Sequence, residues 1–464
     1  MSSSAHFTGQ ISESHTYMQQ EIPNSLKSNA SAQCVRANNR HFQLATSSSS
    51  SQSSGGVLLW NIPPTQGAIG RGTMFLRARI SIATTAAPTY TGADLATAIT
   101  NSAYLSGPGP LQAPILTSTG AVPAGGYATV PALSNGYAWI QRLTLYGTGS
   151  SVIDQMNYVN DTLNLLLEHN SHPSFLQNDG QIQLAVCRPF DSASATKQYV
   201  DVCLPVPLSC FNNSNQDFPL FLCKNPLTMQ LDLASFARAI STGANVGATD
   251  YTIENAYLCY EVLEVPHSMV EAERHAVQSG HPYIMPLQSW LNVQVPMSIL
   301  SSYTIGVNAS SVRGVYVMPY GAASYSSAIG ADNYVRSTSD ASTNWGSGVN
   351  AQLYIDGNIK NSTIYDNPVV QFTGLKQALH NNIQSSVINP SLSTLASYML
   401  NYNALGFDCV SFDDESTIFG GTPATNINIQ LTGYTAQPTY ITTVCILYDT
   451  LLSFGADGIM EVKR

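Results

Sequence analysis

The sequence has 464 residues, with 18 Lys and Arg against 28 Asp and Glu, and a formal net charge of −10. Charged residues make up 10% of it, whereas roughly 25% is usual in soluble domains. The 44% of apolar residues excludes a chain disordered throughout, and the acidic balance argues against a broad phosphate-binding surface. The predicted surface is rich in uncharged polar residues, which favours contacts between copies because buried charges are costly to desolvate.

Targeting and redox signals point to synthesis in a cytoplasm. The N-terminal sequence has neither a basic nor an apolar segment, so we expect no secretory signal, and no apolar stretch is long enough to span a membrane. The cysteines form no C-x-x-C pair, and most stand in apolar, strand-like runs, which predicts small buried side chains in a reducing compartment. They are Cys34, Cys187, Cys203, Cys210, Cys223, Cys259, Cys409 and Cys445.

The N-terminal part of the chain predicts an extended arm followed by strands. Residues 1–55 hold few large apolar residues and end in SSSSSQSSGG, which is typical of a flexible leader. Apolar and β-branched runs then predict strands over 56–62, 73–84 and 137–147. Residues 85–136, rich in Ala, Thr, Gly and Pro, predict a large loop between strands.

Three segments show helical patterns. In 150–170, apolar residues recur at helical spacing after an S-x-x-D capping signature at Ser151 and Asp154. The stripe consists of Val152, Met156, Val159, Leu163 and Leu166. Two shorter patterns predict helices over 265–277, as a link between domains, and over 390–402.

Strand patterns dominate the remainder of the chain. They cover 181–187, 198–208, 227–234, 256–265, 310–320, 351–357, 425–433 and 440–454. A weak internal repeat also appears: TMQLDLAS (228–235) and INIQLTG (427–433) each precede a loop and an apolar strand containing Cys259 or Cys445. Many strands with few helices predict an all-β sandwich or jelly-roll class, and the repeat predicts two related β domains.

The order of five segments is more specific than any single motif. A Gly-rich turn enters a helical pattern in YGTGSSVIDQMNYVNDTLNLLL (146–167), and an apolar, Pro-containing run covers 204–233. VNASSVRGVYVMPY (307–320) opens the second half, which closes with INIQLTG (427–433) and YITTVCILYDTLLSFGADGIMEV (440–462). In this order and position, residues 56–464 resemble the double jelly-roll major capsid proteins of the adenovirus hexon and tectivirus type.

This resemblance implies two jelly-roll β-sandwich domains side by side with a few short inserted helices. The implied divisions are an N-terminal arm (1–55), a first jelly roll (56–265), a linker with a short helix (266–290) and a second jelly roll (291–464). Three copies would form a pseudo-hexagonal capsomer that tiles an icosahedral shell around the genome. The loops 85–136 and 321–350 would form an exterior turret.

The resemblance also implies partners and a location. The chain would contact itself, neighbouring capsomers, and penton and minor capsid proteins, and its arm would run under the shell or along an internal membrane. It would reside in the virion capsid after synthesis in the host cytoplasm, and would read no nucleic-acid sequence. Two other classes stay open: a different viral or phage structural β protein (a spike, a fibre or a single jelly-roll shell protein), and a carbohydrate-binding or hydrolytic β-sandwich.

Candidate chemical sites all have a simpler structural interpretation. The turn YGTGSS (146–151) lacks the third glycine and βαβ context of a phosphate loop. Glu168, His169 and His172 have ligand-like spacing, but they close the predicted helix, where His complements the helix dipole. The acidic run 413–415, near Asp408, could hold Ca²⁺, although a solvated loop is favoured. We therefore expect no enzyme, and assign no catalytic, cofactor-binding or metal-binding residue.

Overall fold

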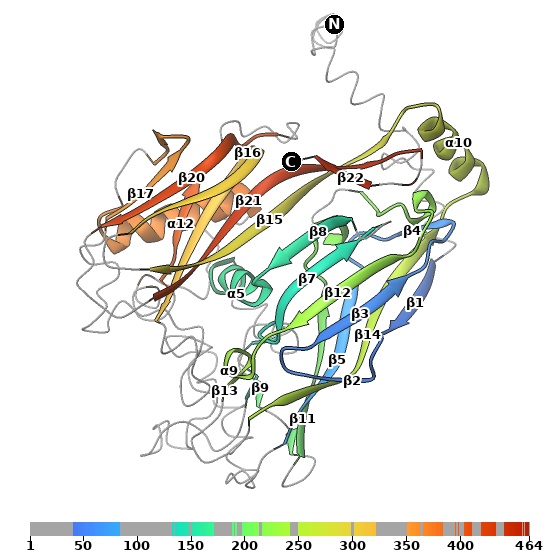
Figure 1. Ribbon diagram of the computed structural model, residues 1–464, viewed down its shortest axis with the longest axis horizontal. Helices are drawn as coiled ribbons and strands as arrows, with labels where there is room; N and C mark the ends of the chain where they lie inside the picture. The colour runs from blue at the N-terminus through green and yellow to red at the C-terminus, as the bar shows by residue number, and fades with distance from the viewer. Residues whose placement is uncertain are drawn as a thin grey trace, which may run out of the picture.

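A computed structural model places the chain in two β units that lie side by side (Figure 1). It describes residues 40–83, 132–133, 135–147, 151–170, 188–189, 191–192, 197–212, 216–241, 249–297, 301–321, 350–361, 365–383, 395, 398, 403–410, 419–432, 440–456, 458 and 460–463. Within these residues, no helix is both long and apolar enough to cross a membrane.

The first unit contains fourteen described strands. They are β1 (Arg40–Thr46), β2 (Ser51–Ser53), β3 (Val57–Ile62), β4 (Gly67–Ile69), β5 (Phe75–Ala83), β6 (Ala132–Leu133), β7 (Ile140–Tyr146), β8 (Val152–Asn157), β9 (Arg188–Pro189), β10 (Asp191–Ser192), β11 (Lys197–Pro205), β12 (Leu227–Leu233), β13 (Ile240–Ser241) and β14 (Tyr251–Glu264). Its helices are α5 (Val159–Asn170), α8 (Ser209–Asn212), η3 (Leu220–Leu222) and α9 (Phe236–Ala239).

The helix α10 (His267–Gln278) connects the first unit to the second, which has eight described strands. They are β15 (Tyr283–Met297), β16 (Ser301–Gly321), β17 (Asn350–Ile355), β18 (Asn358–Ile359), β19 (Leu405–Asp408), β20 (Thr422–Thr432), β21 (Tyr440–Phe454) and β22 (Met460–Lys463). The helix α12 (Pro368–Ile383) lies between β18 and β19 in the chain.

Two sheets of the first unit have the strand order of a jelly roll. One sheet runs β1-β14-β5-β11 and the other runs β3-β12-β7-β8, all in antiparallel pairs. Counted along these eight principal strands, the orders are first-eighth-third-sixth and second-seventh-fourth-fifth. This interleaving is that of two Greek keys folded into one sandwich. A third, small sheet runs β13-β6-β9.

The second unit has the same strand order, except that one long strand takes two of the eight positions. The 21-residue strand β16 supplies both the second and the third position: its first part pairs with β20, and its last part pairs with β21 and β19. The register shifts twice between Gly306 and Val312, around Asn308, which has a positive φ of 50°. The resulting orders, β15-β21-β16-β19 and β16-β20-β17-β18, match those of the first unit.

This equivalence supports the repeat seen in the sequence. TMQLDLAS falls on the seventh strand of the first unit, and INIQLTG on the seventh strand of the second. Cys259 and Cys445 both lie on eighth strands. The two helices α5 and α12 also occupy the same place, between the fifth and sixth strands.

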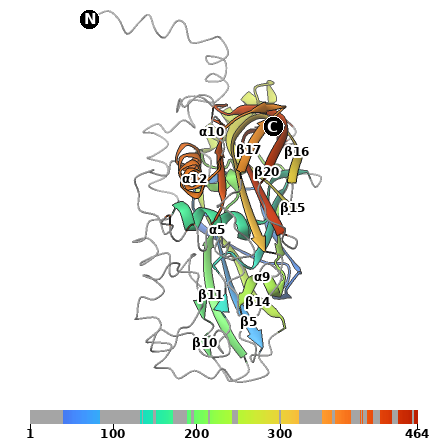
Figure 2. The same cartoon turned by 90° about the vertical axis from the view of Figure 1, so that its left-hand side faces the viewer.

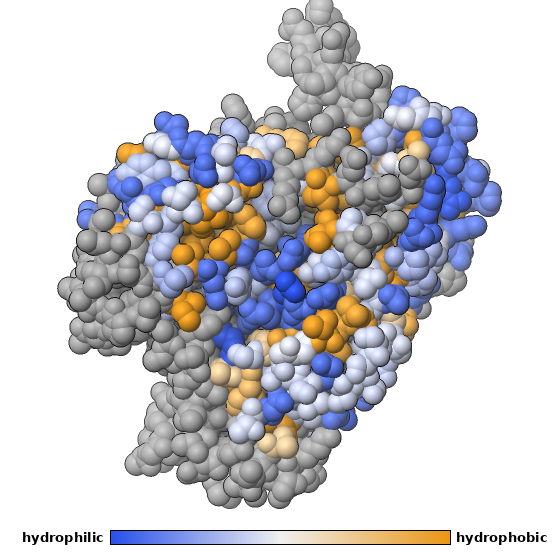
Figure 3. Space-filling model, viewed as in Figure 1, coloured by the Kyte–Doolittle hydropathy of each residue, from blue (hydrophilic) through white to orange (hydrophobic). Residues whose placement is uncertain are grey.

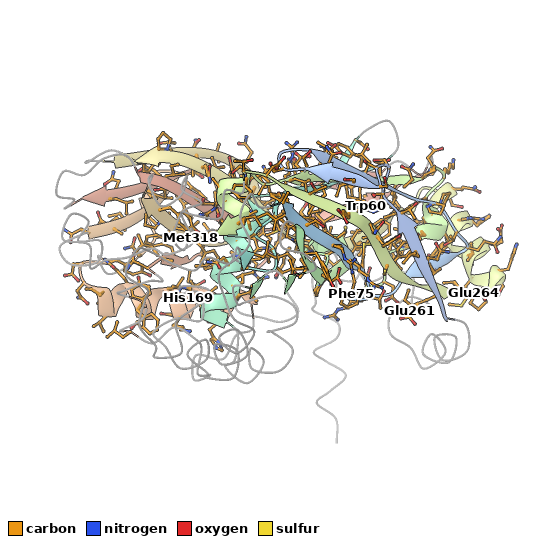
Figure 4. The ribbon with its side chains drawn as sticks, turned by 90° about the horizontal axis from the view of Figure 1, so that it is seen from below. Trp60, Phe75, His169, Glu261, Glu264 and Met318 are labelled. Atoms are coloured by element: carbon orange, nitrogen blue, oxygen red, sulfur yellow. The ribbon has the colours of Figure 1, made fainter. Side chains whose placement is uncertain are left out.

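The core of the first unit lies between its two sheets. Alternate residues of β3 and β12 are buried, as the pleat of a half-exposed strand requires. Trp60 on β3 is 1% exposed and lies between the sheets (Figure 4), where its indole N–H donates to the carbonyl of Ala256 at 3.3 Å. That bond satisfies the polar atom of a side chain that otherwise contributes apolar area.

The last part of β16 and the strand β21 are buried on both faces. Val315 and Val317 point into the core of the second unit, whereas Tyr316, Met318 and Tyr320 join the apolar cluster that extends into the first unit. The alternation is the same on β21, where residues of both clusters follow one another. Burial on both faces explains why 310–320 and 440–454 read as continuous apolar runs.

The N-terminal boundary differs from the expected one. Residues 40–46 and 51–53, placed in the extended arm by composition, form β1 and β2, and both pair with β14. Composition missed them because Leu44 faces outward and is 62% exposed, so the strand needs few large apolar residues. In the same way, β15 begins at Tyr283, within the predicted linker 266–290, although α10 agrees with the helix predicted over 265–277.

The predicted helix over 150–170 is in fact a strand followed by a helix. Residues 152–157 form β8, which pairs with β7, and α5 starts at Val159. The chain changes direction at Tyr158, whose φ of 47° is positive. Helical and strand spacing both bury Met156, so the apolar pattern could not separate the two.

The helix α12 was not predicted. Its β-branched Val369 and Val370 and its internal Gly374 are poor helix formers. The signal present in the sequence was the start: Asn367 Oδ1 accepts the Val370 N–H at 3.0 Å, and Pro368 occupies the first helical position. The helix lies close to β19, because a Cβ on Gly406 would come within 2.8 Å of the Cα of Leu375.

Other predicted segments lie wholly or mostly outside the described residues. These are the strand 181–187 and the loops 85–136 and 321–350. Of the helix predicted over 390–402, Leu395 and Tyr398 are described, and both are helical.

Candidate functional site: the seam between the two units

The most unusual feature of the described residues is the seam, where β8 and α5 of the first unit lie against β15 and β21 of the second (Figure 1). One apolar cluster runs from Trp60 through the seam to Met318 and Phe454. Figure 4 shows Trp60 in the first unit and Met318 in the second. The two units therefore share one continuous core, and have less freedom to move than two domains on a linker.

Aromatic rings form the apolar part of this contact. The Phe454 ring lies 5.7 Å from that of Phe218 and 5.8 Å from that of Tyr283, both edge-to-face. Phe218 belongs to the first unit and Phe454 to the second. Trp290 packs against Tyr316 with centroids 5.9 Å apart. Such pairs stabilise by about 0.5–1.5 kcal/mol beyond the area that they bury.

A buried ion pair lies at the centre of the seam. Arg238 is 2% exposed and Asp161 is fully buried, and the guanidinium contacts the Asp161 carboxylate. Both residues belong to the first unit, but the second unit completes their environment. Thr443 Oγ1 donates to Asp161 Oδ2 at 2.7 Å, and the Tyr320 ring lies 4.6 Å from the Arg238 guanidinium carbon. The charges are thus solvated by groups from both units instead of water.

An amide from the second unit bridges β8 and α5. Asn292 Nδ2 donates to the carbonyl of Asn157 at 2.6 Å and to Thr162 Oγ1 at 2.9 Å. Thr162 Oγ1 also lies 3.2 Å from Cys445 Sγ on β21. Asn292, Thr162 and Cys445 are buried, so the Asn292 amide group and Thr162 hydroxyl need these partners, although Asn292 Oδ1 is buried without one among the described residues. Because Asn292 must reach both Asn157 and Thr162, these hydrogen bonds fix the position of β15 along the first unit.

A second buried carboxylate lies farther along the seam. Asp154 on β8 accepts hydrogen bonds from Ser289 Oγ at 3.0 Å and from the Cys210 N–H at 3.2 Å. Burial raises the pKa of Asp154, and these hydrogen bonds oppose the shift only in part. The same burial raises the pKa of the Cys210 thiol well above its usual value.

The two inserted helices meet at the edge of the seam (Figure 2). Lys376 on α12 donates from Nζ to the carbonyl of His169, in the last turn of α5, at 2.6 Å. Burial lowers the pKa of Lys376 to about 8. The His169 ring meets that of Tyr398 edge-to-face at 6.2 Å. A cation at this position complements the C-terminal end of the α5 dipole.

The residues considered for ligand binding have structural roles where they are described. Gly147 N–H donates to Ser151 O at 2.8 Å, so 146–151 joins two strands and does not lead from a strand into a helix. His169 is 1% exposed in the seam, and His172 lies outside the described residues. Asp408 accepts from Asn381 Nδ2 at 2.5 Å, and 413–415 also lie outside. No group of three His, Cys, Asp or Glu is placed to hold a metal in the described part of the chain.

The cysteines divide by position. Cys210, Cys223, Cys409 and Cys445 are buried thiols, as predicted for small apolar side chains. Cys259 is half-buried and Cys203 is exposed on the outer face of the β1-β14-β5-β11 sheet, which their apolar surroundings in the sequence did not predict.

The seam residues themselves were not predicted from the sequence. The available signal was a polar residue inside an apolar segment, such as Asp161 on the buried side of a helix or Asn292 within β15. Their partners lie between 77 and 282 residues away in the chain, so spacing could not pair them.

Known structures resemble this arrangement, although the sequence matches no protein-family model and no curated protein. The VP54 protein of the virus PBCV-1, fitted into a reconstruction of the virophage Sputnik, aligns with a TM-score of 0.54 and 10% identity. The alignment covers 92% of this chain and 97% of VP54. The Faustovirus major capsid protein aligns with a TM-score of 0.55 and 9% identity, over 89% of this chain and 90% of that protein. The chain therefore has the double jelly-roll fold of viral major capsid proteins, and the predicted fold class is confirmed.

Proposed function

We propose that this chain is a viral major capsid protein, three copies of which form a pseudo-hexagonal capsomer of an icosahedral shell. The observation that carries the proposal is the pair of jelly rolls with identical strand order, locked side by side by a buried seam. Three copies of a rigid two-lobed block present six similar lobes around a three-fold axis, which closes as a ring and can tile in a hexagonal array. The likeness to VP54 and the Faustovirus protein supports this role.

The outer surface of the second unit suits contact with other copies. Along the first part of β16, the exposed residues carry no charge: they are Ser302, Thr304, Gly306, Asn308 and Ser310. On the neighbouring strand, Asn428 Nδ2 donates to both Ser302 Oγ and Thr304 Oγ1 at 2.8 Å. A face of paired hydroxyl and amide groups can be covered without desolvating an ion.

The remaining roles follow from the capsomer. The chain would reside in the virion capsid after synthesis in the host cytoplasm, and contact neighbouring capsomers, penton proteins and minor capsid proteins. The arm that precedes β1 would reach under the shell or toward an internal membrane. The role is structural and not enzymatic, and the buried charged groups described above hold the two units together.

The test is the native mass of the purified protein, measured by light scattering during gel filtration. We expect a species of three times 49.7 kDa, about 149 kDa, that persists on dilution. A monomer of 49.7 kDa would contradict the capsomer and favour a single-copy β-sandwich, such as a sugar-binding protein.

Two truncations separate the arm from the first sheet. Deletion of residues 1–39 leaves β1 and β2 in place, so the trimer should persist while shell assembly is impaired. Deletion of 1–55 also removes both strands and exposes the edge of β14, so it should unfold or aggregate the protein. A monomeric product of the shorter deletion would contradict the role of the arm.

A further inference from the structure

A row of three residues crosses the second unit at the centre of the seam. Cys445 on β21 is paired with Asn292 on β15 and with Tyr316 on β16, so the row takes one residue from each of the eighth, first and third strands of this unit. Each of the three is at most 2% exposed. The first unit covers the row, because Asn292 and Cys445 both meet Thr162 of α5.

The first unit has the same row on its outer face. Cys259 on β14 is paired with Leu44 on β1 and with Phe75 on β5, which are again the eighth, first and third strands. Their chain neighbours Leu76 and Leu258 are buried in the core, so the pleat points the row outward. There Leu44 is 62% exposed, and Cys259 and Phe75 are half-buried. The row that the seam covers in the second unit is therefore open to solvent in the first.

The two inserted helices differ in a similar way. Both stand between the fifth and sixth strands of their units, but α5 lies in the seam and has no exposed residue among those whose burial is described. The helix α12 exposes one stripe along its length, and Ile359 on the fifth strand β18 is exposed as well. The second unit thus exposes the surface that corresponds to the first unit's side of the seam. The stripe of α12 consists of Val369, Thr373, Gln377 and His380.

Exposed apolar side chains gather on these two surfaces. Three of the six large apolar residues that are well exposed in the described part of the chain lie there: Leu44 on one surface, and Ile359 and Val369 on the other. Two of the remaining three, Val57 and Leu59, lie on the outer face of β3, where Figure 3 shows apolar side chains beside a hydrophilic area over β7 and β12. Burial of the two surfaces would desolvate few charges, because their named residues include no Asp, Glu, Lys or Arg.

We propose that the seam is repeated between copies, so that β18 and α12 of one copy lie against the outer face of β1, β14 and β5 of the next. This inference rests on the proposed capsomer. In a ring of six similar lobes, the step that relates the first unit to the second within one copy also relates the second unit to the first unit of the next copy. The same strand positions therefore meet at every step around the ring.

The contact between copies differs from the internal seam in its chemistry. Leu44 stands where Asn292 stands in the second unit, so the contact is apolar at the point where the internal seam has a hydrogen-bonded amide. Cys259 is covered between copies as Cys445 is covered within one chain. Association of copies then depends mainly on apolar burial, which needs less exact geometry than the buried polar groups of the seam.

Two aspartate variants test the two sides of this contact. Leu44→Asp changes the sheet side and Val369→Asp changes the helix side, and each places a carboxylate in an apolar contact. We expect either variant to raise the concentration at which the trimer dissociates by about tenfold or more, measured by light scattering over a dilution series. The matched control is Leu59→Asp, which changes an exposed apolar residue on β3 and should leave that concentration unchanged. Every variant must keep the circular dichroism spectrum of the parent, which excludes misfolding.

A photochemical crosslink locates the contact without relying on stability. With p-benzoylphenylalanine in place of Val369, irradiation of the full-length protein should join two copies into a species of twice 49.7 kDa, about 99 kDa, under denaturing conditions. Mass spectrometry should map the joined peptide to β1, β14 or β5. The same residue in place of Leu59 should give no such pair.

The outcomes separate this contact from the capsomer itself. A trimer that dissociates at the same concentration in Leu44→Asp, Val369→Asp and Leu59→Asp would overturn the contact and leave the capsomer in place. A crosslink from position 369 to other strands, or no crosslink, would overturn the contact in the same way. A parent protein that is monomeric would overturn both.

Discussion

The core of the second unit and the seam are built on opposite faces of the same strands, yet they differ in chemistry. The core consists of aliphatic side chains such as Val315 and Ile446, with a few aromatic rings. The seam combines apolar contacts with the ion pair of Asp161 and Arg238 and the amide of Asn292. Apolar packing tolerates rearrangement, whereas buried polar groups are satisfied in only one geometry. The comparison teaches that the core gives the unit its stability and that the seam gives the two units their fixed relation.

Breaking the ion pair should have the largest effect. Asp161→Ala leaves Arg238 buried without its carboxylate, so we expect a loss of about 3–5 kcal/mol in the free energy of unfolding, measured in urea. The double variant Asp161→Leu, Arg238→Met removes both charges and should restore most of that stability. If the ion pair helps to fix the relative position of the two units, the backbone amides of β15 should still exchange faster in the double variant than in the parent protein. An unchanged exchange pattern would show that the ion pair is not needed to fix the two units relative to each other.

A truncation in the core provides the counterpart. Ile429 is fully buried in the cluster of the second unit, and Ile429→Ala should lower the free energy of unfolding by about 2–5 kcal/mol through lost apolar contact and a cavity. Unlike the seam variants, Ile429→Ala should raise the hydrogen-exchange rates of β20 and β17 more than those of β8. Equal loosening of β8 would mean that the core and the seam unfold as one unit.

The bridging amide should contribute less. Asn292→Ala leaves Thr162 and the Asn157 carbonyl without this donor, which we expect to cost about 1–3 kcal/mol. The control is Asn61→Ala, which removes an amide that accepts a hydrogen bond from Thr228 Oγ1 on the exposed side of β3 and should change stability by less than about 0.5 kcal/mol. Equal losses of stability in Asn292→Ala and in its control, measured by thermal denaturation, would contradict the special role of the seam.

The smallest effect is a dependence on pH. Because burial raises the pKa of Asp154 in the folded state, the folded protein takes up a proton at higher pH than the unfolded chain. Stability from this group therefore rises as pH falls through the folded pKa toward the unfolded value of about 3.9. Asp154→Asn should flatten that part of the stability profile. If the free energy of unfolding changes with pH by the same slope in the parent and the variant, Asp154 is not the source of that slope.

Lys376 predicts a slope in the alkaline range. Burial lowers its pKa to about 8, so between that value and the unfolded pKa of about 10.4 the unfolded chain binds more protons. Stability should therefore rise with pH across this interval, and Lys376→Met should remove the rise. Urea unfolding at a series of pH values from neutral upward measures this rise. A free energy of unfolding that falls with pH in the parent protein would contradict the prediction.

Much of the fold could be predicted from local pattern. The strands of 227–234, 425–433 and 440–454 were located within a few residues, because period-two burial and β-branched residues are local properties. The helix α12 and the strand β1 were missed for different reasons. The helix has poor helix formers behind a good cap, and the strand is a short mixture of polar and apolar residues whose leucine is exposed.

By itself, the sequence determined the β class, the charge-poor surface and the presence of two similar halves, since each depends on composition or on spacing along the chain. Only the tertiary structure decided that Thr443 meets the Asp161 carboxylate and that Asn292 meets Thr162 in the buried seam. The physical reason is that a polar residue within an apolar run has no preferred partner until the strands that carry its hydrogen-bond acceptors and donors are packed against it. The sequence shows where such a residue stands, and the packing of the two units decides what it does.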